Sequence, residues 1–126
     1  MTKAEAIQDF FSRFGIPAYE EHHVPVYLDA AQTVENSPPY ITYQYAESDF
    51  YGESVALTAD IWAPLPERAY VTQKAAEIGA AIRPFRRLVC DDGYIIVTKG
   101  SPFSQCIADG HFEREYLNFW FTFITN

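Results

Sequence analysis

Glu113-Arg114-Glu115-Tyr116-Leu117-Asn118-Phe119-Trp120-Phe121-Thr122-Phe123-Ile124-Thr125 is the stretch that decides the fold, because its side chains alternate in character. Every second residue from position 117 is large and apolar, which predicts one buried face made of Leu117, Phe119, Phe121 and Phe123. The residues between them predict the opposite face, made of Tyr116, Asn118, Trp120 and Thr122. The stretch is therefore expected to be a long β-strand.

Other segments carry the same signal. Residues 55–62 alternate, with Val55, Leu57, Ala59 and Ile61 on one face and Ala56, Thr58, Asp60 and Trp62 on the other. Residues 40–45 are rich in β-branched and aromatic side chains, and a turn over 48–54 would join the two as an antiparallel hairpin. A second hairpin is expected from strands 88–90 and 94–99 around the turn Asp91-Asp92-Gly93. A short strand over 103–107 and a turn at Asp109-Gly110 lead to the last strand.

Two segments have the spacing of amphipathic helices. The first begins with Thr2 as N-cap and Glu5 three residues on, which form a capping box. Its apolar stripe is Ile7, Phe10, Phe11 and Phe14, and Gly15 and Pro17 end it. The second helix is expected over 67–82, after Pro64 and Pro66, with a buried stripe of Val71, Ala75, Ile78 and Ile82.

This order of elements predicts the α+β class. We expect one domain over residues 1–126, with a mixed or mainly antiparallel sheet and both helices packed on one face. Residues 18–39 show no periodicity and contain three prolines, so they predict a long irregular loop. Such a loop is either functional or a simple surface excursion.

Aromatic residues make up 17% of the chain, with nine Tyr, ten Phe and two Trp. Aromatics beyond what a small core can hold are typical of protein–protein interfaces, and the alternative is a Phe-rich core with exposed Tyr. The net charge of −8 disfavours nucleic-acid binding, since phosphate contacts come from Lys and Arg. Arg83, Arg86 and Arg87 form the only basic cluster, which suits a helix end and its exit loop.

Nothing in the sequence predicts a membrane span or a signal peptide. Cys90 and Cys106 are too few for a disulfide framework, which favours reduced thiols in the cytosol. We expect both to be buried strand thiols. Asp91 and Asp92 would raise the pKa of Cys90 and so make it a poor nucleophile.

A search for catalytic or metal-binding patterns finds no complete one. His22 and His23 lie beside Glu20 and Glu21, but adjacent residues point apart and no third ligand has matching spacing. Asp91-Asp92 is explained by turn chemistry, and Glu113 and Glu115 suggest a solvated or interface edge. Residues 99–102 lack a phosphate-binding loop pattern, and Ser101 and Ser104 lie in no nucleophile elbow. The sequence therefore predicts no catalytic residues, no metal and no cofactor, and a protein that is not an enzyme.

Eight segments, in order along nearly the whole chain, resemble the small tail proteins of long-tailed bacteriophages, in particular tail terminators or tail-completion (minor tail) proteins. They are Gly15–Glu21, Val24-Pro25, Pro39–Tyr43, Glu53–Trp62, Glu77–Gly79, Asp92–Val97, Lys99–Gln105 and Arg114–Asn118.

The resemblance implies a virion component or prophage protein that forms a homo-oligomeric, hexameric ring. Such a ring caps the tail tube, stops its growth and joins it to the head, and its partners are tail tube and head-completion proteins. The protein would be found in the host cytoplasm during assembly and then in the virion tail. Neck and minor tail proteins match about as well.

Two other readings stay open. The first is a non-viral protein–protein interaction module. The second is a small hydrolase or ligand-binding domain with a pocket under the long loop, which would use polar groups such as Tyr19, His22 and His23.

Overall fold

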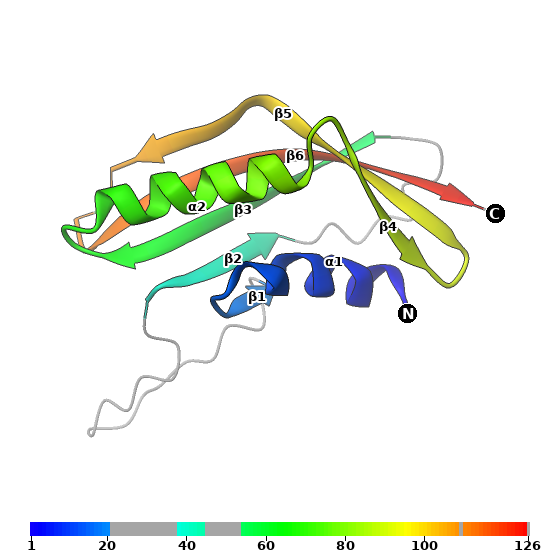
Figure 1. The fold of residues 1–126 in the computed structure, drawn as a ribbon, viewed down its shortest axis with the longest axis horizontal. Coiled ribbons are helices and arrows are strands. Elements are labelled where there is room, and N and C mark those ends of the chain that lie inside the picture. The colour runs from blue at the N-terminus through cyan, green and yellow to red at the C-terminus, as the bar shows by residue number, and fades with distance from the viewer. Residues whose placement is uncertain (21–37, 45–53, 109, 126) are drawn as a thin grey trace, which may run out of the picture.

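The structure is a computed structural model, and it describes residues 1–20, 38–44, 54–108 and 110–125. The elements follow one another as α1 (Lys3–Phe11), a 3-10 turn (Ser12–Phe14), β1 (Ala18–Glu20), β2 (Tyr40–Gln44), β3 (Ser54–Pro64), α2 (Arg68–Ala81), β4 (Arg86–Cys90), β5 (Gly93–Ile107) and β6 (Phe112–Thr125). Two helices packed on a curled six-stranded sheet confirm the expected α+β class (Figure 1).

The sheet has the strand order β1-β2-β3-β6-β5-β4. Only β1 and β2 run parallel, and every other neighbouring pair is antiparallel, so the sheet is mixed and mainly antiparallel as predicted. The hairpin of β2 and β3 and the hairpin of β4 and β5 are both confirmed. The decisive stretch forms β6, which lies between the long strands β3 and β5.

Both helices pack on the same face of the sheet, which we call the inner face. It carries Leu117, Phe119, Phe121 and Phe123, all fully buried. Phe10 and Phe11 of α1 make edge contacts with Phe119, at 6.5 and 5.6 Å between ring centroids. The predicted stripe of α2 is buried against the same face. Burial of each such side chain contributes about 1.5–3 kcal/mol, so this single core holds both helices to the sheet.

The ends of α1 are set by local contacts. The Glu5 amide donates to Thr2 Oγ1 at 3.1 Å, and the Thr2 amide donates to Glu5 Oε1 at 2.8 Å, which confirms the capping box. After the 3-10 turn, Gly15 adopts a φ of 81°, a left-handed conformation that glycine reaches without strain. The chain then turns into β1.

The structure corrects the predicted elements in two places. Residues 18–20 form β1, although the sequence analysis placed them in the long loop; a strand of three residues is too short to show alternation. Residues 94–99 and 103–107 belong to one strand, β5, which continues through a register shift between Lys99 and Ser104. Such a bulge breaks the sequence alternation without ending the strand. Residues 21–37 of the predicted loop, residues 48–53 of the predicted turn and Asp109 lie outside the described residues.

Candidate interaction surface

The outer face of the sheet, opposite the helices, carries a group of aromatic side chains. Tyr40 of β2 pairs with Trp62 of β3, and Trp62 pairs with Arg114 of β6. The ring centroids of Tyr19 and Tyr40 are 5.9 Å apart, those of Tyr40 and Trp62 are 6.4 Å apart, and those of Trp62 and Phe112 are 5.9 Å apart. We call this group, with two further side chains on the same face of β6, the aromatic surface: Tyr19, Tyr40, Trp62, Phe112, Arg114, Tyr116 and Trp120.

Arg114 is fixed within this surface. Its Nε donates to Asp60 Oδ1 at 2.7 Å, and its guanidinium carbon lies 4.9 Å from the Trp62 ring centroid and 6.0 Å from that of Tyr116. The Trp62 indole N–H donates to Thr42 Oγ1 at 2.9 Å. These contacts hold the arginine and the indole in place before any partner arrives, so binding would cost little side-chain entropy.

The charges on the outer face are partly removed from water. Burial raises the pKa of Asp60 above its ordinary value of 3.8, and the hydrogen bond and positive charge of Arg114 offset only part of that rise. Burial also raises the pKa of Tyr40, with a contribution from Tyr19. Asp60 is engaged by Arg114, so this arrangement suits recognition rather than proton transfer.

Trp120 is the most exposed member of the aromatic surface, with 43% of its area accessible. It faces away from the core, as its neighbours Phe119 and Phe121 are fully buried on the inner face. Aromatic and arginine side chains are the residues that most often dominate binding energy at protein interfaces. The aromatic surface therefore has the composition of a docking site.

Glu113 and Glu115 do not form a solvated edge, which corrects one of the two alternatives predicted for this pair, a solvated or an interface edge. Both lie on the inner face beside the N-terminal end of α2, and Glu115 is only 6% exposed. Arg68 Nη2 donates to Glu115 at 3.2 Å, and Arg68 Nη1 lies 3.9 Å from Glu113. The pair was misread because the position of α2 over β6 cannot be seen in the alternation of β6 alone. Its role is to fix the start of α2.

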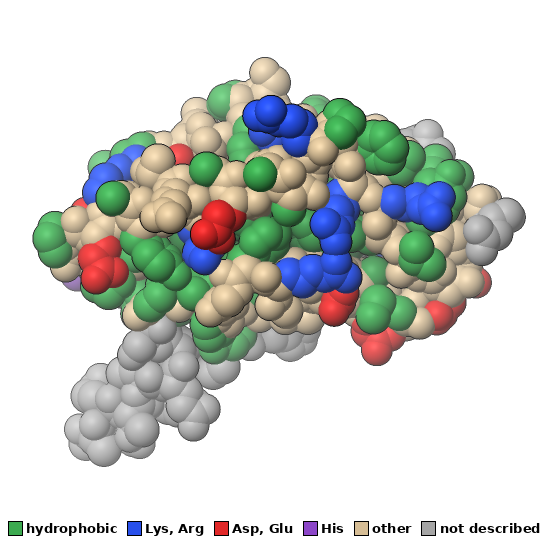
Figure 2. All heavy atoms as spheres, viewed as in Figure 1, with side chains coloured by type: hydrophobic (Ala, Val, Ile, Leu, Met, Phe, Trp, Pro, Cys, Tyr) green, Lys and Arg blue, Asp and Glu red, His purple; other side chains and the backbone are tan. Residues whose placement is uncertain are grey.

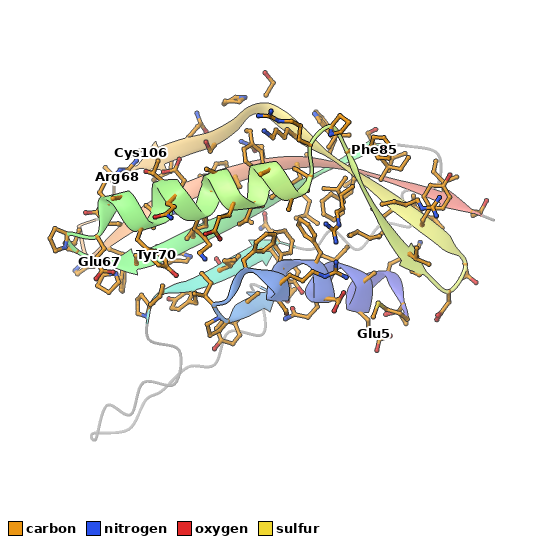
Figure 3. The ribbon with its side chains drawn as sticks, in the orientation of Figure 1. Glu5, Glu67, Arg68, Tyr70, Phe85 and Cys106 are labelled. Atoms are coloured by element: carbon orange, nitrogen blue, oxygen red, sulfur yellow. The ribbon has the colours of Figure 1, made fainter. Side chains whose placement is uncertain are left out.

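The two cysteines differ in environment. Cys90 is buried in β4 as expected, and burial raises the pKa of its thiol, with the carboxylates of Asp91 and Asp92 adding to the rise. Cys106 is exposed on β5, which corrects the expectation of a buried thiol. It pairs with Glu115 across the sheet, near Arg68 (Figure 3). This half of β5 has no pairing with β4, which ends its contact with β5 at Val97, so Cys106 lies at an edge of the described sheet.

The arginine cluster is divided between two elements. Arg83 follows the end of α2, whereas Arg86 and Arg87 begin β4. Arg86 Nη1 lies 3.5 Å from the carbonyl oxygen of Ala81, so it complements the C-terminal end of the helix, as the sequence predicted. Arg87 points to the outer face, where its guanidinium lies 4.8 Å from the Tyr94 ring centroid.

Of the four residues considered as metal ligands, Glu21, His22 and His23 lie outside the described residues, and Glu20 is the last residue of β1. Within the ranges that the structure covers, no three His, Cys, Asp or Glu side chains are grouped as metal ligands would be.

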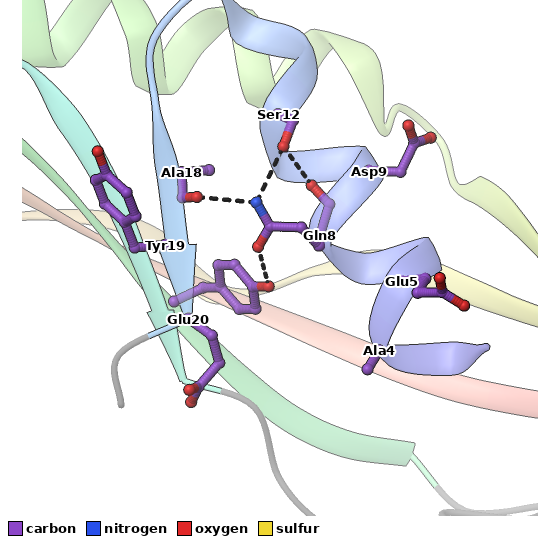
Figure 4. A pocket seen from close by; sticks show the side chains of 9 residues that line it. Ala4, Glu5, Gln8, Asp9, Ser12, Ala18, Tyr19 and Glu20 are labelled. Atoms are coloured by element: carbon purple, nitrogen blue, oxygen red, sulfur yellow. Dashed lines mark hydrogen bonds between the residues drawn. The ribbon is translucent and has the colours of Figure 1, made fainter. Parts of the chain in front are cut away.

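A groove of about 660 Å³ lies between α1 and β1, and Tyr19 is among the residues that line it (Figure 4). The ligand-binding alternative expected a pocket under the long loop, whose residues 21–37, with His22 and His23, lie outside the described residues. Gln8 Nε2 donates to the Ala18 carbonyl at 2.9 Å and to Ser12 Oγ at 3.1 Å, and its Oε1 accepts from the Tyr43 hydroxyl. These hydrogen bonds join α1 to β1 and β2. The polar groups of the groove therefore serve the packing of the helix on the sheet.

The pairing of Asp60 with Arg114 was not predicted from the sequence. Alternation placed Asp60 and Trp62 on the polar face of one strand and Tyr116 and Trp120 on that of another, but these faces join only because β3 is adjacent to β6. One sequence feature did point to this surface: Arg114 precedes Tyr116 by two residues, so alternation places an arginine on the same face as Tyr116 and Trp120.

No helix in the described ranges has the length and apolar character needed to cross a bilayer. Comparisons of the chain with protein-family models, with curated proteins and with solved structures gave no match.

Proposed function

We propose that this protein is a structural protein that assembles with copies of itself, as the tail terminator of a long-tailed phage or prophage. In this role a ring, most simply a hexamer, caps the tail tube and joins it to the head. The observation that carries the self-assembly is the aromatic surface, in which Arg114 is held between Trp62 and Tyr116 on the helix-free side of the sheet. The tail position rests on the ordered sequence resemblance.

The chemistry of the surface supports assembly over catalysis. Its polar groups form closed pairs, Asp60 with Arg114 and Thr42 with Trp62. Every buried side-chain polar atom among the described residues has a hydrogen-bond partner, so this part of the chain offers no orphaned group poised to react. Rigid aromatic and arginine anchors give a large contact area at low entropic cost, which a ring interface requires at each of its joints.

Light scattering and sedimentation of the purified protein, alone and with tail tube protein, test this proposal. We expect a ring that forms in solution or on the tube. In Trp120→Ala the association should weaken by about 30-fold, because loss of an anchor tryptophan costs about 2 kcal/mol or more. Phe85→Ala is the matched control, since Phe85 is an aromatic residue, 54% exposed, at the far end of α2 from Arg68 (Figure 3).

Equal effects of Trp120→Ala and Phe85→Ala on association would exclude the aromatic surface as the interface. A protein that stays monomeric at every concentration, with and without tube protein, would contradict the self-assembly itself. A stable complex with tube protein that never closes into a ring would favour a neck or minor tail protein.

A further inference from the structure

Positive and negative charges are distributed unequally along this chain. All nine Lys and Arg residues lie within the described ranges, together with ten of the seventeen Asp and Glu residues. The described body is therefore close to neutral. The remaining seven carboxylates, which carry nearly all of the net charge of −8, lie outside it: Glu21, Asp29, Glu35, Glu47, Asp49, Glu53 and Asp109.

A second groove, of about 320 Å³, runs along the side of α2 that faces β5. Small residues form its helical wall: Ala75, Ala76, Gly79 and Ala80. Lys99 and Phe103 of β5 lie against this wall because Gly79 has no side chain; a Cβ there would be 3.2 Å from Lys99 Nζ and 3.1 Å from the Phe103 ring. The groove therefore lies between the small residues of α2 and these two side chains of β5.

The polar lining of this groove is cationic. Arg83 and Lys99 are exposed, and neither is within ion-pair distance of a carboxylate among the described residues. Glu115 also lines the groove, but its charge is engaged by Arg68 at 3.2 Å. Thr72 and Ser104 add hydroxyl groups. Figure 2 shows one group of Lys and Arg side chains at the bend of β5, above the C-terminal end of α2, with other cationic side chains spread over the same face.

We infer that this groove binds the acidic segment 21–37 of a second copy of the chain. The segment contains Glu21, Asp29 and Glu35 and no Lys or Arg, which complements the charges of Arg83 and Lys99. Its 17 residues span at most about 56 Å when fully extended. Because both ends of the segment join the sheet, its middle can reach at most about half of that distance from the sheet. This inference rests on the proposed self-assembly, and it names a second contact between neighbouring copies.

The topology favours a neighbouring copy over the same molecule. The segment leaves from β1 and returns to β2, at one edge of the sheet, and the groove adjoins β5, four strand positions from β1 or about 19 Å, so distance alone does not separate the two cases. The groove opens, however, on the side of α2 that faces away from α1 and β1 (Figure 1). The segment of the same chain would have to cross over α2 to reach it. Contact between unlike surfaces of successive copies is the arrangement that closes a ring.

A charge-swap experiment tests this contact. The groove variant Arg83→Glu/Lys99→Glu and the segment variant Asp29→Lys/Glu35→Lys should each associate about tenfold more weakly than the wild type, because each places like charges together. An equimolar mixture of the two should associate like the wild type, since each groove then meets a segment of opposite charge. The control variant Glu47→Lys/Asp49→Lys has the same change in net charge and should not rescue the groove variant.

A synthetic peptide of residues 21–37 separates this inference from the self-assembly. By fluorescence anisotropy it should bind the wild-type protein, bind the groove variant at least about tenfold more weakly, and lose affinity as salt is raised. Peptide binding by a wild type that stays monomeric would support the groove while contradicting the ring. Assembly of the groove variant at wild-type strength, rescue by the control variant, or equal peptide binding to both proteins would overturn the inference.

Discussion

At the residue scale, Asp60 and Arg114 show how a charged pair is used on a sheet surface. Asp60 lies on β3 and Arg114 on β6, and the short contact between them spans neighbouring strands. Trp62 and Tyr116 lie beside Arg114, and both charges are partly shielded from water. Loss of one partner would leave the other charge poorly solvated, which is more costly than loss of an exposed ion pair.

The raised pKa of Asp60 gives a measurable dependence of stability on pH. A raised pKa means that the folded protein binds a proton more readily than the unfolded chain does. The free energy of unfolding of the wild type, relative to Asp60→Asn, should therefore fall as the pH rises from the ordinary Asp value of 3.8 through the raised value. Urea unfolding of both proteins across this interval measures the difference.

Glu5→Gln is the control of opposite sign. The hydrogen bond from the Thr2 amide lowers the pKa of Glu5 below its ordinary value of 4.5. The wild type should gain stability relative to this variant as the pH rises from the lowered value through the ordinary Glu value of 4.5. A difference for Asp60→Asn that also rises with pH would contradict the assignment.

At the element scale, alternation predicted the faces of β3 and β6 correctly, because each strand is long and half of its side chains are buried. The same reasoning missed β1, which is too short to alternate, and divided β5 at its bulge. Strand order could not be obtained either, since it depends on pairings between distant segments. For that reason the individual halves of the aromatic surface were predictable, whereas their union across β3 and β6 was not.

Gly93, which begins β5, is required by the packing of neighbouring strands. A Cβ at this position would lie 2.0 Å from the carbonyl oxygen of Ile124 and 2.9 Å from the Cα of Thr125 on β6. Backbone atoms cannot yield as a flexible side chain can, so Gly93→Ala should lower the free energy of unfolding by about 2 kcal/mol or more.

Denaturant unfolding checks this value, with Gly110→Ala as the matched control. Apart from its chain neighbours, no heavy atom of the described residues lies within 4 Å of a Cβ built at Gly110, so that variant should unfold with nearly the wild-type free energy. Equal stability of the two variants would show that β5 and β6 can separate at this end without cost.

At the scale of the whole molecule, the sheet divides the protein into two sides with different tasks. The inner side holds both helices and the core, and the outer side presents the aromatic surface. The sequence predicted the α+β class and the apolar residues that form the single core. It did not predict that the described residues are nearly neutral while seven carboxylates lie in the remaining segments, because the net charge does not show how charged residues are distributed over the fold.

The positions of the two tryptophans make intrinsic fluorescence a probe of the outer face. Trp62 and Trp120 are the only tryptophans in the chain, and both lie on the outer face, so the core contains none. Their intrinsic fluorescence should therefore respond to docking at that face. Assembly should shift the emission to shorter wavelength as the exposed indole of Trp120 leaves water, and Trp120→Ala should reduce that shift to the contribution of Trp62. Titration of the unlabelled protein would then follow its own assembly in real time.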